Sequence, residues 1–166
     1  KGYKLQYLTK VGLTKQKEDY TFDFYRGRVL FPIHSISGRV LGFGGRTLKN
    51  DKKVAKYYNS PESPIYNKSE ILYGLYFSKG AIIKYDECFL CEGYTDVISM
   101  FQSGIENVVS SSGTSLTREQ IRLVKRYTKN LTILYDGDAA GIKASFRGID
   151  LILEEGLNVQ VVLFPN

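Results

Sequence analysis

The chain has 166 residues, 43% of them apolar, which is enough for one large domain or two small ones with a buried core. Its longest apolar runs are far short of a membrane span and no secretory leader is visible, so we expect no membrane partner. Residues 1–60 carry 13 Lys and Arg against 4 Asp and Glu, whereas residues 61–166 carry 10 against 13. A basic front section favours a polyanionic partner, although a solvated lysine-rich surface has the same composition.

The first recognisable pattern is a β-hairpin. Residues 28–36 (RVLFPIHSI) and 39–47 (RVLGFGGRT) are two β-rich runs, and Ser37 and Gly38 between them form a turn signal. Pro32 cannot donate a ladder hydrogen bond, so the first run is expected at a sheet edge or a bulge. The following stretch, up to residue 70, is rich in turn residues.

After residue 87 the pattern becomes a regular alternation of strands and helices. We predict strands over 88–92, 106–111, 131–136 and 158–164 and helices over 94–103, 117–127 and 139–155. Such alternation indicates an α/β fold with a mostly parallel sheet covered on both faces. The change of pattern predicts two domains, 1–80 and 81–166.

Two helix signals support this reading. Thr117 and Gln120 form a capping box that starts one helix. Gly156 follows the last helix as a C-cap. The spacing of apolar residues in that helix predicts an inward stripe made of Ile142, Phe146, Ile149 and Leu153.

Acidic residues and glycine end two of the predicted strands. Glu92 closes one, and Asp136, Gly137 and Asp138 close another; Ser110 to Thr114 end a third. Sites in open α/β sheets form beyond the carboxyl ends of the strands. Carboxylates gathered there suit magnesium and a phosphate under transfer. D-G-D alone is also typical of a turn with solvated carboxylates, but Glu92 at an equivalent strand end favours the metal site.

The two cysteines, Cys88 and Cys91, have the C-x-x-C spacing of zinc and redox motifs. They lie in an apolar strand, where residues three apart point to opposite faces. With no second cysteine pair and a single histidine, His34, we interpret them as buried thiols in a reducing compartment.

Several motifs together resemble a known family. EGYTD at residues 92–96 and DGDAAG at 136–141 are similar to the two signatures of the Toprim domain of primases, topoisomerases and some nucleases. The flanking segments resemble the basic subdomain of bacterial DnaG-type primases: RVLFPI (28–33), GFGGR (42–46), KYYNSPE (56–62), LYGL (72–75) and SGT (112–114). The resemblance implies a Toprim-like sheet preceded by an amino-terminal α+β basic subdomain.

The resemblance also implies an activity and its residues. The activity is synthesis of short RNA primers from ribonucleoside triphosphates on a single-stranded DNA template, in the bacterial cytoplasm. Glu92, Asp136 and Asp138 would be the catalytic acids that hold Mg²⁺, or Mn²⁺, with Asp96 in support. The residues that would line the groove for template and nucleotide are Arg26, Arg28, Arg46, Lys56, Asn59 and Lys68.

Parts of the family pattern are missing. A further acidic pair follows the segment matched here by residues 163–165, and this chain stops at Asn166. The amino-terminal zinc module and the carboxy-terminal module that binds the replicative helicase are also absent. We therefore expect a fragment of the polymerase core, weakly active or inactive alone.

Two other functions remain open. A Toprim nuclease or topoisomerase would share Glu92 and the D-G-D motif. A non-catalytic fragment could bind single-stranded DNA by stacking bases on Tyr25, Phe43, Tyr57 and Tyr58, unless these rings pack a small core instead.

Overall fold

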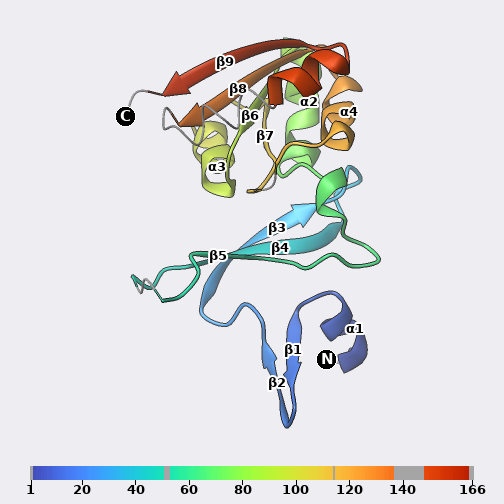
Figure 1. Ribbon diagram of the computed structural model, residues 1–166, viewed down its shortest axis with the longest axis vertical. Coiled ribbons are helices and arrows are strands. Elements are labelled where there is room, and N and C mark those ends of the chain that lie inside the picture. The colour runs from blue at the N-terminus through green and yellow to red at the C-terminus, as the bar shows by residue number, and fades with distance from the viewer. Residues whose placement is uncertain (1, 51–52, 114, 137–147, 165–166) are drawn as a thin grey trace. The chain divides into compact units, whose positions relative to one another are not determined.

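The computed structural model describes residues 2–50, 53–113, 115–136 and 148–164. The chain divides into two compact units, Lys1–Asn67 and Lys68–Asn166 (Figure 1). Within the described residues, no helix combines the length and the apolarity that crossing a bilayer requires.

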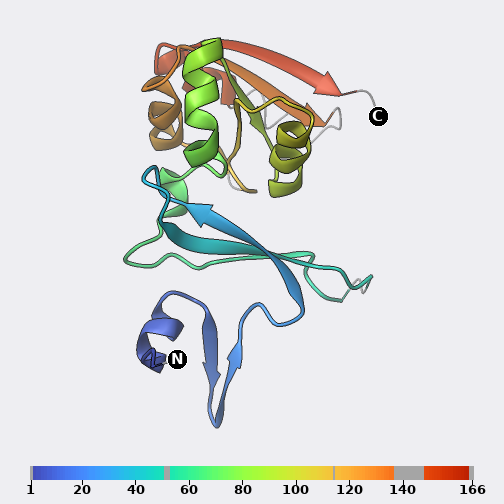
Figure 2. The ribbon, with the colours of Figure 1, turned by 180° about the vertical axis from the view of Figure 1, so that it is seen from behind.

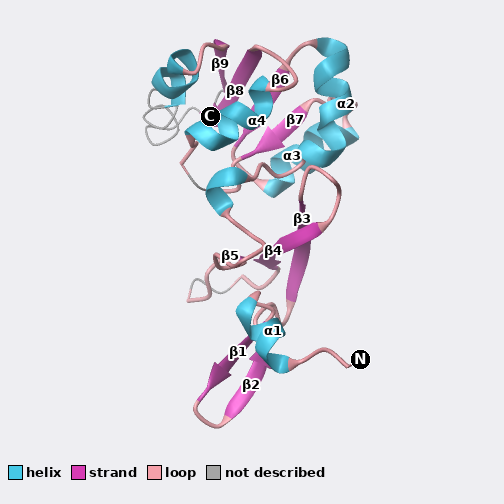
Figure 3. Cartoon of the chain, turned by 90° about the vertical axis from the view of Figure 1, so that its right-hand side faces the viewer, coloured by secondary structure: helices cyan, strands magenta, loops and turns pink. Residues whose placement is uncertain are grey.

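The first unit contains two small antiparallel sheets and one short helix. Its elements are α1 (Leu5–Lys10), β1 (Thr14–Lys17), β2 (Tyr20–Asp23), β3 (Arg28–His34), β4 (Val40–Thr47) and β5 (Tyr57–Asn59). β1 pairs with β2, and the other strands form a sheet in the order β3-β4-β5. α1 lies beside the β1–β2 hairpin (Figure 3).

The predicted hairpin is present as β3 and β4. Pro32 lies on β3, which is an edge strand of its sheet, and the register shifts between Ile33 and His34. Gly38 adopts a φ of 86° in the connecting turn, a conformation that glycine reaches without steric cost. The sequence therefore located both the hairpin and its irregularity.

The core of the first unit centres on Tyr25. Its ring is buried, and its hydroxyl lies 2.8 Å from Ser60 Oγ and donates to the carbonyl oxygen of Phe43 at 2.9 Å. A Cβ atom added at Gly45 would lie 2.5 Å from the Tyr25 ring, so this position requires glycine. Tyr25 thus packs a core rather than an exposed base-stacking surface.

The second unit is a parallel sheet between helices. Its elements are η1 (Lys68–Glu70), α2 (Leu75–Tyr85), β6 (Cys88–Cys91), α3 (Tyr94–Gln102), β7 (Val108–Ser110), α4 (Arg118–Lys125), β8 (Asn130–Asp136), a helix at residues 148–154, and β9 (Asn158–Phe164). The strand order is β7-β6-β8-β9, and every pair is parallel. α2 and α3 cover one face, while α4 and residues 148–154 cover the other (Figures 1 and 2). This confirms the predicted α/β class.

Both helix signals are confirmed. Thr117 Oγ accepts from the Gln120 N–H at 3.2 Å, and the Gln120 side chain accepts from the Thr117 N–H at 3.2 Å. Gly156 has a φ of 76°, and the Leu157 N–H donates to the Ile152 carbonyl, which closes the last helix as a Schellman motif.

The inward stripe predicted for the last helix is wrong at Leu153, which is 55% exposed, because Ile152 is the buried residue of that turn. Ile142 and Phe146 lie outside the described residues. α2 was not predicted, and it crosses residue 80, where the sequence pattern places the domain boundary. Also unpredicted are the small elements α1, β1, β2 and β5.

Candidate functional site

The candidate acidic site lies at the carboxyl edge of the second unit's sheet. Glu92 directly follows β6, and Asp136 is the last residue of β8; the two strands are neighbours, with Leu90 paired to Ile133. β6 leads through α3 to β7 on one side, and β8 leads to β9 on the other. The chain therefore changes direction between β6 and β8, at the switch point where α/β sheets bind ligands.

Hydrogen bonds fix the backbone around Glu92. Ser110 Oγ donates to the Glu92 carbonyl oxygen at 2.7 Å, and Ser110 also pairs through its backbone with Tyr73. Asp96 Oδ2 accepts the Gly93 N–H at 2.8 Å, which caps α3. Glu92 itself is exposed. The sheet thus presents one carboxylate at its edge on a firmly held backbone.

The loop after β7 borders the same edge. Ser112 has a φ of 59°, uncommon for a residue with a Cβ, and its N–H donates to Ser110 Oγ at 2.8 Å. Such strain is often found at functional sites. Thr114 and Asp138 lie outside the described residues, and only the backbone of Asp136 is described. Within the described part of the chain, no three His, Cys, Asp or Glu side chains are close enough to hold a metal ion.

The two cysteines are buried thiols, as predicted. Burial raises the pKa of Cys91 to about 12 and raises that of Cys88 as well. Cys91 Sγ lies 3.4 Å from the Val109 carbonyl oxygen. Thiols protonated at neutral pH are poor metal ligands and poor nucleophiles.

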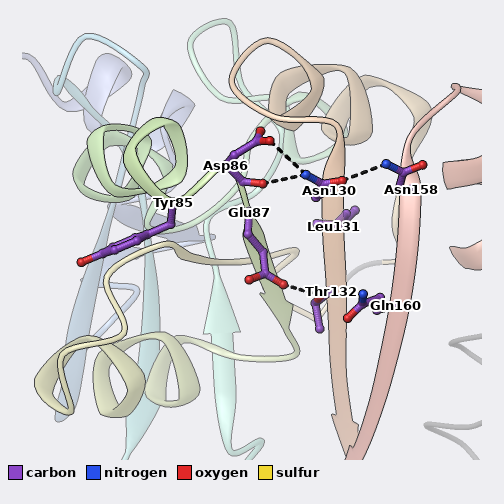
Figure 4. Close-up of a pocket in the computed structure, with 8 residues that line it drawn as sticks. All are labelled: Tyr85, Asp86, Glu87, Asn130, Leu131, Thr132, Asn158 and Gln160. Carbon is purple, nitrogen blue, oxygen red and sulfur yellow. Dashed lines mark hydrogen bonds between the residues drawn. The ribbon is translucent and has the colours of Figure 1, made fainter.

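A different hollow, of about 330 Å³, opens at the amino edge of the same sheet (Figure 4). Its polar side chains bind one another: Asn130 Nδ2 donates to Asp86 Oδ2 at 3.2 Å, and Asn158 Nδ2 donates to Asn130 Oδ1 at 2.8 Å. Thr132 Oγ donates to Glu87 at 2.8 Å. These bonds tie β8 and β9 to the turn that precedes β6, so we interpret this edge as structural.

The basic residues predicted to bind nucleic acid occupy several places. Arg46 on β4 and Lys56 before β5 line a hollow of about 570 Å³ in the first unit. Arg26 is exposed between β2 and β3, and Asn59 ends β5. Lys68 lies on η1 in the second unit.

The hollow also contains Lys49, which is not among the residues predicted from the sequence. The signal was present, because Lys49 lies within the run of positive charge between Arg46 and Lys56. Arg46 extends over the ring of Tyr57, 5.6 Å from its centroid. The hollow therefore combines three cations with an adjacent aromatic ring, a combination suited to nucleic acid.

Comparison with known proteins decides the family. Residues 1–79 match the family described as DNA primase catalytic core, N-terminal domain, and residues 89–166 match the Toprim-like family. The chain belongs to the DnaG-type DNA primases.

Individual relatives are similar to this chain over both of its units. The DNA primase of Halalkalibacterium halodurans is 46% identical over 92% of this chain and 25% of its own length. The Aquifex aeolicus primase structure (zinc-binding and RNA polymerase domains) has a TM-score of 0.91 at 40% identity, over 98% of this chain and 40% of that one. A DnaG primase catalytic domain bound to single-stranded DNA has a TM-score of 0.88 at 38% identity, over 97% of this chain and 53% of that one.

The chain spans about a quarter of the length of the curated primases it matches. Membership of this family implies the use of a divalent metal ion.

Proposed function

We propose that this chain forms part of the polymerase core of a DNA primase, which synthesises short RNA primers on single-stranded DNA during replication. The observation that carries the proposal is the pair Glu92 and Asp136 at the switch point of the sheet, in a chain of the primase family. The basic hollow supports it, as does the similarity to a primase domain whose structure contains single-stranded DNA.

The acidic edge would serve as the metal site. Its donors are carboxylates, one of them exposed, and oxygen donors of this kind suit a hard divalent cation. Glu92, Asp136 and Asp138 would hold Mg²⁺, or Mn²⁺, with Asp96 supporting the first of them by capping α3. When bound, the ion would neutralise charge that develops on the phosphates.

Each group of residues has its own task in this proposal. Ser110 holds the Glu92 backbone, so the carboxylate stays at the edge where the primer's 3′-hydroxyl must lose its proton. Arg26, Arg46, Lys56 and Lys68 would bind phosphates of the template and of the ribonucleoside triphosphates, and Asn59 would shape the groove. Zinc and the replicative helicase would bind modules other than these two units, and the protein would act in the cytoplasm.

Nucleotide incorporation on a single-stranded template tests the proposal. In the full-length protein we expect incorporation to require divalent metal and to fall by at least about 100-fold in Glu92→Gln. Glu106→Gln is the matched control, because Glu106 is an exposed carboxylate outside the site. Near-normal incorporation by Glu92→Gln would contradict the proposal, and nicking of supercoiled DNA without incorporation would favour a Toprim nuclease or topoisomerase.

A further inference from the structure

The side chain of Arg28 is bonded to the protein's own backbone. Its Nη1 donates to the carbonyl oxygens of Gly45 at 3.1 Å and Lys56 at 3.3 Å, and its Nη2 donates to that of Ala55 at 2.9 Å. Three of the five guanidinium N–H groups therefore point at carbonyls. Arg28 lies on β3, so one side chain connects two strands, β3 and β4, with the segment that leads into β5.

These three carbonyls adjoin two of the residues that line the basic hollow. Gly45 immediately precedes Arg46, and Ala55 immediately precedes Lys56. The Lys56 carbonyl also accepts the N–H of Thr47 at 3.1 Å. The guanidinium thus fixes the separation between the backbone that carries Arg46 and the backbone that carries Lys56.

A series of stacked side chains fixes the guanidinium in turn. Its central carbon lies 3.5 Å from the centroid of the Tyr58 ring. The Tyr58 ring stacks on Phe24, with centroids 5.1 Å apart and an interplanar angle of 2°, and Lys15 Nζ lies 4.3 Å from the Phe24 centroid. Cation–π contacts and offset stacking both stabilise such an arrangement. The sheet and the β1–β2 region therefore hold Arg28 in one orientation.

We propose that Arg28 is a positioning residue for template binding: it holds Arg46 and Lys56 at the separation that neighbouring phosphates require. This inference rests on the proposed function of the hollow, and it replaces a direct phosphate contact by Arg28 with an indirect role. Lysine cannot perform that role, because an ammonium group lacks the planar fork that reaches several carbonyls while it stacks on a ring.

Affinity for single-stranded DNA tests the inference with the positive charge kept constant. We expect Arg28→Lys to weaken binding about tenfold, roughly the effect of losing hydrogen bonds made by a charged group. Arg39→Lys, an equivalent change at the exposed hairpin turn, should leave affinity unchanged. Binding by Arg28→Lys at the wild-type level would overturn the inference and indicate that Arg28 contributes only charge.

A double-mutant cycle separates positioning from general destabilisation. If Arg28 acts through Lys56, then adding Arg28→Lys to Lys56→Ala should weaken binding further by less than about threefold. A purely structural effect would instead lower the affinity equally in both backgrounds, which would also overturn the inference.

Hydrogen exchange on the DNA-free chain distinguishes failure of this inference from failure of the proposed function. Arg28→Lys should speed exchange of the Thr47 amide, which donates to the Lys56 carbonyl. If the wild type does not bind single-stranded DNA, the proposed function fails, and this exchange rate decides whether the clamp exists. Unchanged exchange at Thr47 would refute the clamp.

Discussion

The two units are stabilised in different ways. In the described residues of the first unit, four apolar or aromatic residues are buried, against eighteen in the second. The second unit is a sheet covered on both faces, whereas the first depends on Tyr25, on the Arg28 clamp and on stacked rings. Burial of apolar surface is the dominant favourable contribution to folding, so we expect the second unit to have the larger free energy of unfolding.

This difference explains how each unit presents its charges. In the second unit, Glu92 lies with its side chain exposed at the edge of a sheet that is stabilised mainly by buried apolar residues. In the first unit, the backbone that carries Arg46 and Lys56 is itself held by polar contacts. We therefore expect mutation of Glu92 to affect chemistry more than folding, and mutations near the basic hollow to affect both the shape of the hollow and its affinity for nucleic acid.

The largest effect on stability is expected in the core of the second unit. Ile133 on β8 is fully buried, and Ile133→Ala should lower the free energy of unfolding by about 2–5 kcal/mol. Val29→Ala on β3 removes apolar atoms from a residue that is 43% exposed, and should cost less than about 1 kcal/mol. Urea denaturation measures both, and equal losses would contradict the contrast between the units.

Two glycines provide a comparison of opposite sign. Gly45→Ala should cost about 1–3 kcal/mol, because the new Cβ would lie 2.5 Å from the hydrogen-bonded Tyr25 ring. Gly80→Ala, inside α2 with nothing within 4 Å, should add about 0.5–1 kcal/mol through helix propensity. The same denaturation experiment tests the pair. Stabilisation by Gly45→Ala would mean that the first unit is more loosely packed than described.

The smallest effect concerns the ion pairs that Glu155 makes in the second unit. The hydrogen bond from Arg122, with its charge and that of Arg118, holds the pKa of Glu155 below its ordinary value. Its stabilising contribution is complete above the unfolded-state pKa and is lost as pH falls through the folded-state pKa. Arg122→Ala should therefore lower the melting temperature at pH 7 more than at pH 3, with Arg126→Ala as a control of equal charge. A difference that grows towards low pH would refute this assignment.

The regular part of the chain was predictable from sequence because its signals are local. The apolar runs at 88–91 and 130–136, the Thr117 capping box and Gly156 each indicate one structure. The position of Glu92 and Asp136 at strand ends followed from that pattern, whereas the strand order that makes the two strands neighbours at a switch point did not.

The missed elements lack a distinguishing pattern. The apolar residues of α2 are not confined to one face, since Phe77 and Ile83 are exposed while Leu75 and Ile82 are buried, so its hydrophobic pattern does not indicate an amphipathic helix. The role of Arg28 depends on carbonyls 17 to 28 residues away along the chain. The sequence alone shows that Arg28 is a cation, but it does not indicate which groups this cation binds.

The central claim is that the first unit supplies most of the affinity for nucleic acid and the second carries the metal chemistry. Binding of single-stranded DNA without divalent metal, measured over a series of salt concentrations, tests it most directly. We predict that Lys56→Ala weakens binding and reduces the salt slope by about 0.7, one phosphate contact, whereas Glu92→Gln binds as well as the wild type or better because a like charge is removed. Loss of metal-free binding in folded Glu92→Gln, with Lys56→Ala unaffected, would contradict the account.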